Sequence, residues 1–167
     1  GVATAQNVAD AINAAKKASK TEITANTGEA ANATTGNVTL TSTTAADGHT
    51  IYDVKLNDKV TLGTGANAVT IDGTAGKATV GTAVVDGVNN TITTGGANAV
   101  SLDGAAGKAT IGSSVVDGVN NTITTGGANA VSLDGAAGTV TGLTNKDWTP
   151  GVTKAVTGRA ATEDQLQ

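Results

Sequence analysis

The sequence has no cysteine, phenylalanine or methionine, and only one proline, one tryptophan and one tyrosine among its 167 residues. Without cysteine the chain forms neither a disulfide framework nor a thiolate zinc site. Leu, Ile and Val together are just under a fifth of the residues, so any core must be built largely from small side chains. Such a core buries little area per residue, whereas ordering each residue costs about 1.5 kcal/mol. We therefore expect association with other chains to supply buried area.

Charge and long apolar runs are also scarce. The formal net charge is −4 with 14% charged residues, which argues against the highly charged disordered class and against a general nucleic-acid binder. No apolar run approaches the roughly 20 residues that span a bilayer, and no signal-peptide pattern opens the chain. For an exported protein, targeting and membrane-anchoring parts are expected outside this segment.

What the chain has in abundance is glycine and an internal repeat. The stretch VVDGVNNTITTGGANAVSLDGAAG at residues 84–107 occurs again unchanged at 115–138. The letters ANAV begin at Ala66, Ala97 and Ala128, which gives a period of 31 residues. A fixed period of this length predicts stacked supersecondary units that bury one another's faces. Short strand candidates such as NTITT, AVSL and KATIG alternate with Gly-rich turns in each unit.

The N-terminal part predicts one helix and one hairpin. Thr4 is a plausible N-cap, and apolar residues follow at helical spacing at Val8, Ala11, Ile12 and Ala15. The alternating segments GNVTLTSTT and TIYDVKL predict two strands, with ADGH at 46–49 as the turn between them.

The C-terminal part predicts the start of a second helix. Thr162 and Gln165 have the spacing of a capping box, two acidic residues follow in the first turn, and Leu166 is the first apolar contact. Trp148 has two readings: a structural residue that fills space at a junction, or an exposed binding anchor.

Three stretches resemble the head region of trimeric autotransporter adhesins, specifically the Hia/Hsf-type adhesins of Haemophilus. ATAQNVADAIN at 3–13 resembles the helix that opens the family's Trp-ring domains, GLTNKDW at 142–148 the segment before the neck, and GRAATEDQLQ at 158–167 the start of the neck itself. The sequence departs from the Trp-ring pattern after the first helix, where the family usually has a tryptophan and this chain has Lys16, Lys17 and Lys20.

The resemblance implies a mainly β fold: an intertwined homotrimeric β-prism head with a short N-terminal helix and a C-terminal neck that leads into a coiled coil. Residues 1–62 would be the Trp-ring-like helix and hairpin region, 63–141 three Gly-rich repeats, and 142–167 the neck and the start of the stalk helix. Trp148, Thr162, Gln165 and Leu166 are the candidates for trimer and neck packing.

The same resemblance implies a non-enzymatic function as an adhesin or a structural spacer. The chain would belong to the passenger domain of an outer-membrane protein on the bacterial cell surface. Its partners would be two further copies of itself and a host-cell receptor or an extracellular matrix protein, with no cofactor or metal. No receptor-contact residues are predicted.

The alternative is a monomeric β-solenoid, either a carbohydrate-active enzyme or a calcium-dependent surface protein. In a solenoid Asp72, Asp103 and Asp134 would stack in a column. Each repeated Asp-Gly turn offers one carboxylate, whereas calcium needs several oxygen ligands, and Asp-Gly is a common hairpin turn.

Other motifs favour ordinary interpretations. GTGANA at 63–68 precedes a strand pattern, whereas a dinucleotide site requires a helix. His49 has no predicted catalytic partners and is expected in an exposed turn. Lys16, Lys17 and Lys20 are expected to be a solvated helix end, although they could contact an acidic partner. No glycosylation is predicted from the N-x-T spacing at Asn32, Asn37, Asn89 and Asn120.

Overall fold

The computed structural model describes residues 1–26 and 36–167. Asn32 therefore lies outside the described residues. Two compact units can be distinguished, residues 1–60 and 61–167, and each is described by itself. The structure is mainly β, with one N-terminal α-helix and antiparallel sheets.

The first unit begins with helix α1 (Ala5–Ser19). Thr4 is its N-cap, as predicted: the Asn7 backbone N–H donates to the Thr4 hydroxyl (3.1 Å), and the Asn7 side chain accepts the Thr4 N–H (3.0 Å). Lys16 and Lys17 lie in the last turn, where cations suit the negative end of the helix dipole. No residue of α1 is buried.

The predicted hairpin is confirmed. Strands β1 (Val38–Thr44) and β2 (Thr50–Leu56) pair antiparallel along their whole length, from Val38 opposite Leu56 to Thr44 opposite Thr50. The turn is closed by the Gly48 N–H, which donates to the Ala45 carbonyl (2.9 Å). Apolar residues of both strands share one face, and Leu40 on that face is 1% exposed.

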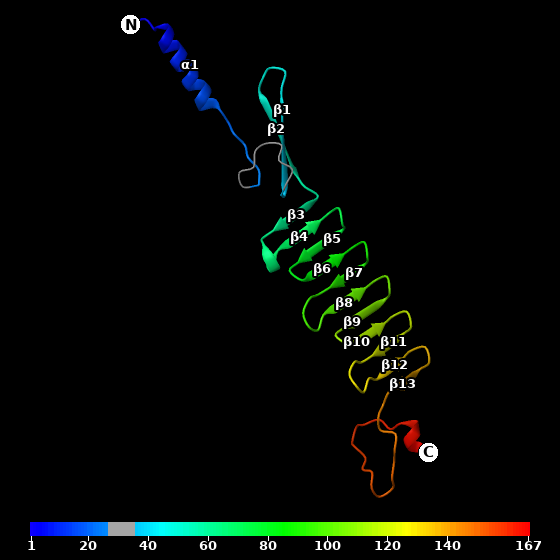
Figure 1. The fold of residues 1–167 in the computed structure, drawn as a ribbon. Coiled ribbons are helices and arrows are strands. Elements are labelled where there is room, and N and C mark those ends of the chain that lie inside the picture. Colours follow the sequence, from blue (N-terminus) through cyan, green and yellow to red (C-terminus); the bar gives the residue numbers. More distant parts are fainter. Residues whose placement is uncertain (27–35) are drawn as a thin grey trace. The chain divides into compact units, whose positions relative to one another are not determined.

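The second sheet is an eleven-stranded antiparallel meander in which each strand neighbours the next along the chain (Figure 1). Its strands are β3 (Lys59–Leu62), β4 (Val69–Asp72), β5 (Lys77–Val80), β6 (Ala83–Asp86), β7 (Thr91–Thr93), β8 (Val100–Asp103), β9 (Lys108–Ile111), β10 (Ser114–Asp117), β11 (Thr122–Thr124), β12 (Ser132–Asp134) and β13 (Thr139–Thr141). A short 3-10 helix, η1 (Gly65–Asn67), lies between β3 and β4.

One 31-residue period corresponds to four strands. Strands β8–β11 repeat β4–β7, and β12 and β13 form the first half of a third period. Equivalent pairs have the same register, so that Ile92 faces Leu102 as Ile123 faces Leu133. The predicted repeat units are therefore neighbouring parts of one continuous sheet.

The sheet ends after β13 at Gly142. This residue has φ +92°, and a Cβ on it would collide with the Ala130 carbonyl. Only glycine adopts that conformation without strain and leaves room for the close approach.

The C-terminal segment ends in a 3-10 helix, η2 (Glu163–Leu166), rather than in the α-helical turn expected from the sequence. Thr162 and Gln165 do form the predicted capping box, and Gln165 Oε1 accepts the Thr162 N–H (3.3 Å). The Gln165 N–H donates to the Thr162 carbonyl (3.1 Å), the i to i+3 bond that tightens the first turn of many helices.

Burial is sparse in the part of the chain that the structure describes. Ala25 and Leu40 are its buried apolar residues, and Asp86 and Asp117 its buried polar ones. No helix in this part is long and apolar enough to cross a membrane.

Candidate assembly surface

The register of the repeat sheet aligns one residue per strand into rows that run across it. Paired residues of antiparallel strands point to the same face. One row holds only Ile, Ala, Val and Leu, and we call it the apolar stripe: Ile71, Ala78, Val85, Ile92, Leu102, Ala109, Val116, Ile123, Leu133 and Val140.

The larger side chains of the apolar stripe remain about half exposed in the part of the chain that the structure describes. Its isoleucine, leucine and valine side chains are 47–59% exposed. At about 4.8 Å per strand, the ten positions form a continuous apolar band roughly 43 Å long. Soluble monomers seldom expose contiguous apolar surface of this extent, and such a surface marks an interaction site.

A second row widens the apolar face within two of the repeats. Val69 pairs with Val80, which pairs with Ala83, and Val100 pairs with Ile111. These residues lie two positions along their strands from the stripe and therefore point to the same side. Val80 and Ile111 are 59% and 60% exposed.

The opposite face is largely polar. One row there consists of Asp72, Lys77, Asp86, Thr91, Asp103, Lys108, Asp117, Thr122, Asp134 and Thr139. The next row on this face is mostly threonine and serine, interrupted by Val84 and Val115. The meander is thus an amphipathic sheet with one polar and one apolar face.

Two buried carboxylates fix the hairpin turns on the polar face. Asp86 Oδ1 accepts the backbone N–H groups of Val88 (3.0 Å) and Asn89 (2.9 Å), and its Oδ2 accepts the Asn89 side-chain amide (2.8 Å). Lys77 Nζ lies 3.5 Å from the same Oδ2. The backbone N–H of Asn89 is the largest cause, followed by its side-chain amide, of a pKa of Asp86 below its usual range.

Asp117 repeats this arrangement with Asn120 and with Lys108, whose Nζ lies 3.8 Å away. The pKa of Asp117 is lowered for the same reason, with the Asn120 backbone N–H as the largest cause. These groups stabilise turns and do not converge on a common point.

The column of aspartates expected for a solenoid is not formed. Asp72, Asp103 and Asp134 lie on β4, β8 and β12, four strands apart, so about 19 Å separates consecutive members. The reason is topological: each 31-residue unit spreads across four strands of a meander rather than coiling back onto the previous unit. Among the described residues no three His, Cys, Asp or Glu side chains form a group that could hold a metal ion.

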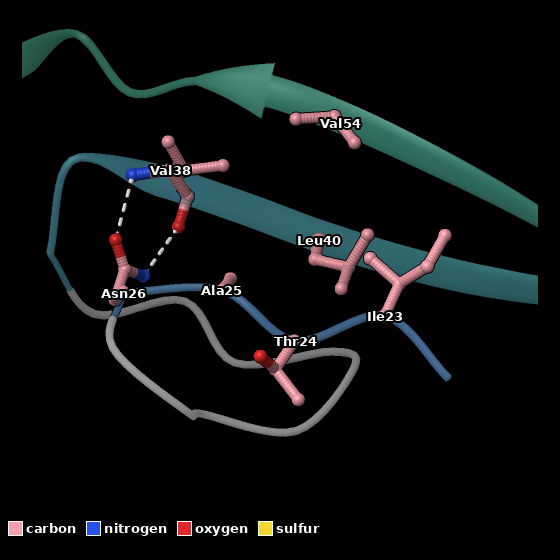
Figure 2. A pocket seen from close by; sticks show the side chains of 7 residues that line it. All are labelled: Ile23, Thr24, Ala25, Asn26, Val38, Leu40 and Val54. Atoms are coloured by element: carbon pink, nitrogen blue, oxygen red, sulfur yellow. Dashed lines mark hydrogen bonds between the residues drawn. The ribbon is translucent and has the colours of Figure 1, made fainter. Parts of the chain in front are cut away.

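In the first unit, a shallow cavity of about 210 Å³ lies between β1, β2 and residues 23–26 (Figure 2). Its lining is Ile23, Thr24, Ala25, Asn26, Val38, Leu40 and Val54. The Asn26 side chain donates to the Val38 carbonyl (2.7 Å) and accepts the Val38 N–H (3.2 Å), which holds this segment against β1.

Three of the four predicted neck residues, Trp148, Thr162 and Gln165, lie around Asn145, which was not among the predicted residues. The Thr162 hydroxyl donates to the Asn145 carbonyl (2.7 Å), and the Asn145 side chain donates to Gln165 Oε1 (2.8 Å). Trp148 and Gln165 line one cavity of about 90 Å³ together with Asn145. Trp148 is 46% exposed, whereas Leu166 is 80% exposed and does not line this cavity.

The remaining sequence motifs have ordinary surroundings. His49 is exposed in the hairpin turn and contacts Asp47. GTGANA precedes strand β4 rather than a helix, as the sequence indicated. Lys16, Lys17 and Lys20 are exposed at the end of α1.

Comparison with known proteins gives no relative. No family model, no curated protein and no solved structure matches the chain.

Proposed function

We propose that this chain is a segment of a homotrimeric fibre on the bacterial cell surface, in which three repeat sheets face one another through their apolar stripes. The observation that carries the proposal is the stripe itself: ten apolar positions in ten successive strands, whose larger side chains are about half exposed among the described residues. Three amphipathic sheets related by a threefold axis enclose such faces in a prism and leave the polar faces to water.

The energetics favour association. Fully burying a Val, Leu or Ile side chain stabilises by about 1.5–3 kcal/mol, so covering the exposed half of each gains about 1 kcal/mol. Over the stripe this amounts to several kcal/mol per chain, which is comparable with the whole net stability of a small domain. A single chain by itself does not gain this burial free energy.

Helix α1 also has an exposed apolar face, since none of its residues is buried. Val8 and Ile12, one turn apart, are 49% and 61% exposed. A helix of 15 residues is marginal in water by itself, and its stability in proteins comes mostly from packing of an apolar face. Side-by-side association of three copies supplies a partner for this face.

Within such a fibre the segment serves as an adhesive head or as a spacer that sets its length. The partner would be a host-cell receptor or an extracellular matrix protein. The identical repeats favour a contribution to length, and trimerisation would triplicate any weak contact on the polar faces, which raises avidity. A neck around Asn145 and Trp148 would join the head to a coiled-coil stalk.

Sedimentation equilibrium over a wide concentration range tests the trimer. The proposal expects about three times the 16.0 kDa chain mass, stable on dilution. A folded 16.0 kDa species throughout would refute it, and a dimer would replace the prism by a two-sheet sandwich.

Adhesion is tested separately with the assembled protein. Binding to host cells and to immobilised matrix proteins is measured for the whole chain and for a variant lacking one 31-residue repeat. Binding by the whole chain supports the adhesive role. A trimer that binds neither surface is a spacer.

A further inference from the structure

The chain contains six Asp-Gly pairs whose local environments differ. Five lie in the repeat sheet, at Asp72, Asp86, Asp103, Asp117 and Asp134, and the sixth is Asp47–Gly48 in the β1–β2 turn. Asp-Gly is the sequence in which an aspartyl side chain is most open to attack by the next backbone nitrogen, because glycine has no side chain to hinder the approach. The six pairs therefore provide an internal comparison of one reaction in different surroundings.

Hydrogen bonds restrain the carboxylates of the five repeat aspartates and so disfavour this reaction. In each, Oδ1 accepts two backbone N–H groups, those of the residues two and three positions further on, at 2.9–3.0 Å. These paired bonds fix the orientation of the carboxylate toward the turn.

In four of the five repeat pairs the attacking nitrogen also donates a backbone hydrogen bond. The N–H groups of Gly87, Gly104, Gly118 and Gly135 donate to backbone carbonyls of neighbouring turns at 2.7–2.9 Å. Freeing them requires separation of adjacent hairpins within the eleven-stranded sheet.

Asp47 is held much less firmly. Its side chain is 74% exposed, and the backbone bond it accepts, from the His49 N–H, is 3.5 Å long. The Gly48 N–H donates within its own turn to Ala45, so local opening of the hairpin tip is enough to free it. The His49 ring contacts the Asp47 carboxyl through Nδ1 and is itself 63% exposed.

We propose that Asp47–Gly48 is a site of spontaneous isoaspartate formation, and that it reacts ahead of the other five Asp-Gly pairs. The Gly48 nitrogen attacks Asp47 Cγ, a new N–C bond forms, and the carboxyl hydroxyl leaves with the amide proton as water. Water then adds to either carbonyl of the five-membered imide. One product is aspartate again, and the other is isoaspartate, in which the main chain runs through the side-chain carbon.

The contacting imidazole gives the reaction a proton carrier. His49 is placed to transfer a proton to the departing carboxyl oxygen, and as the single histidine of the chain it has no counterpart in the repeat turns. The product lengthens the main chain of the turn by one carbon, which changes the geometry that pairs β1 with β2.

The experiment is prolonged incubation of the whole folded chain at neutral pH in water enriched in heavy oxygen, followed by tryptic digestion in ordinary water and mass spectrometry. Each passage through the imide incorporates one heavy oxygen. Cleavage after lysine separates Asp47, in residues 21–55, from the repeat aspartates in 60–77, 78–108 and 109–146. The expected result is labelling of 21–55 several-fold faster than of the other three peptides.

Two controls assign the label in 21–55 to Asp47. Asp47→Glu cannot close the five-membered ring and should remove most aspartate-derived label from 21–55. The other aspartate in this peptide, Asp53, is followed by Val54, whose branched side chain hinders the attack. Label from asparagine is recognised by the accompanying change of amide to acid. In denaturant, all six pairs should label at similar rates, because the protection of the repeats is lost. Equal labelling rates for all four peptides of the folded chain, or faster labelling of a repeat peptide than of 21–55, would overturn the proposal.

His49→Asn separates the contribution of the imidazole from that of the weakly held turn. The variant keeps a polar turn residue but removes the imidazole, so labelling at Asp47 should slow while remaining ahead of the repeat peptides. The inference concerns the hairpin turn alone and does not depend on the proposed trimer.

Discussion

The β1–β2 hairpin and the repeat sheet differ in how far their apolar side chains are buried. In the hairpin Leu40 is 1% exposed because residues 23–26 of the same unit cross its strand. In the repeat sheet the isoleucines and leucines of the stripe remain about half exposed. The difference shows that one chain can bury a small apolar cluster locally and leave a larger apolar face exposed.

The largest effect is expected from a charge within the apolar stripe, at Ile123 on β11. Ile123→Lys places a charge on the apolar face, which is incompatible with burial against other copies and should cost the assembly several kcal/mol. We expect a shift of the sedimentation-equilibrium mass to that of the single chain.

The matched control is Thr122→Lys, the preceding residue of β11. Its side chain lies on the polar face, in the row that already carries Lys77 and Lys108. This variant should keep the oligomeric mass. Equal behaviour of the two variants would argue that the two faces of the sheet do not differ in function.

In the hairpin, Leu40→Ala should lower the free energy of unfolding by about 2–5 kcal/mol, because it leaves a cavity at a side chain that is almost fully buried. Tyr52 on β2, the single tyrosine, reports hairpin unfolding by its fluorescence. If Leu40 is buried by its own chain, the loss of stability should not depend on protein concentration. Val54→Ala, at the cross-strand partner that is 64% exposed, is the control and should cost less.

Removal of one period, residues 97–127, should have a smaller effect on stability. The junction regenerates TTGGANAV, and β7 can pair with β12 in the register that β7 makes with β8. We expect a folded protein of unchanged oligomeric state whose sheet is shorter by about 19 Å, as measured by small-angle X-ray scattering. An aggregated or unfolded product would contradict the equivalence of the repeats.

The smallest predicted effect concerns pH. The folded-state pKa of Asp86 lies below its ordinary value of 3.8, so its carboxylate contributes stability above that value. This contribution is lost as the pH falls through the folded pKa. Asp86→Asn should therefore lower stability at neutral pH, and its difference from the original chain should shrink below about pH 3.8, as followed by thermal unfolding at a series of pH values.

Asp117→Asn should reproduce the Asp86→Asn profile, since the two carboxylates have equivalent partners. Asp10→Asn on α1 makes the same change in net charge and is the control for charge alone. If the stability of Asp86→Asn follows pH in parallel with that of the original chain, ionisation of Asp86 is not the cause of the difference.

Much of the secondary structure could be predicted from the residues. Thr4 and the spacing of Val8 and Ile12 located the first helix, and the alternation around Val38 and Ile51 located the hairpin. Local signals of this kind depend on neighbouring residues only. The η2 turn was predicted as the start of an α-helix because capping signals fix where a helical turn begins but not whether its bonds span three or four residues.

The candidate surface was less accessible to prediction. The shortage of large side chains predicts association, which stays a prediction, but neither the stripe nor Asn145 was identified from the sequence. Each strand contributes only one or two apolar residues to the face, so no single segment has a strong pattern. The role of Asn145 depends on contacts with Thr162 and Gln165, which lie 17 and 20 positions away.

The sequence by itself determined where strands and turns fall, because β-branched alternation, Asp-Gly turns and helix caps act over a few residues. It also determined the period of 31 and the equivalence of the repeats. Only the tertiary structure decided that the strands form a meander rather than a coil, since the two arrangements satisfy the same local signals with different partners. That choice of neighbours aligns ten dispersed apolar residues into one stripe and separates three aspartates that a coil would have stacked.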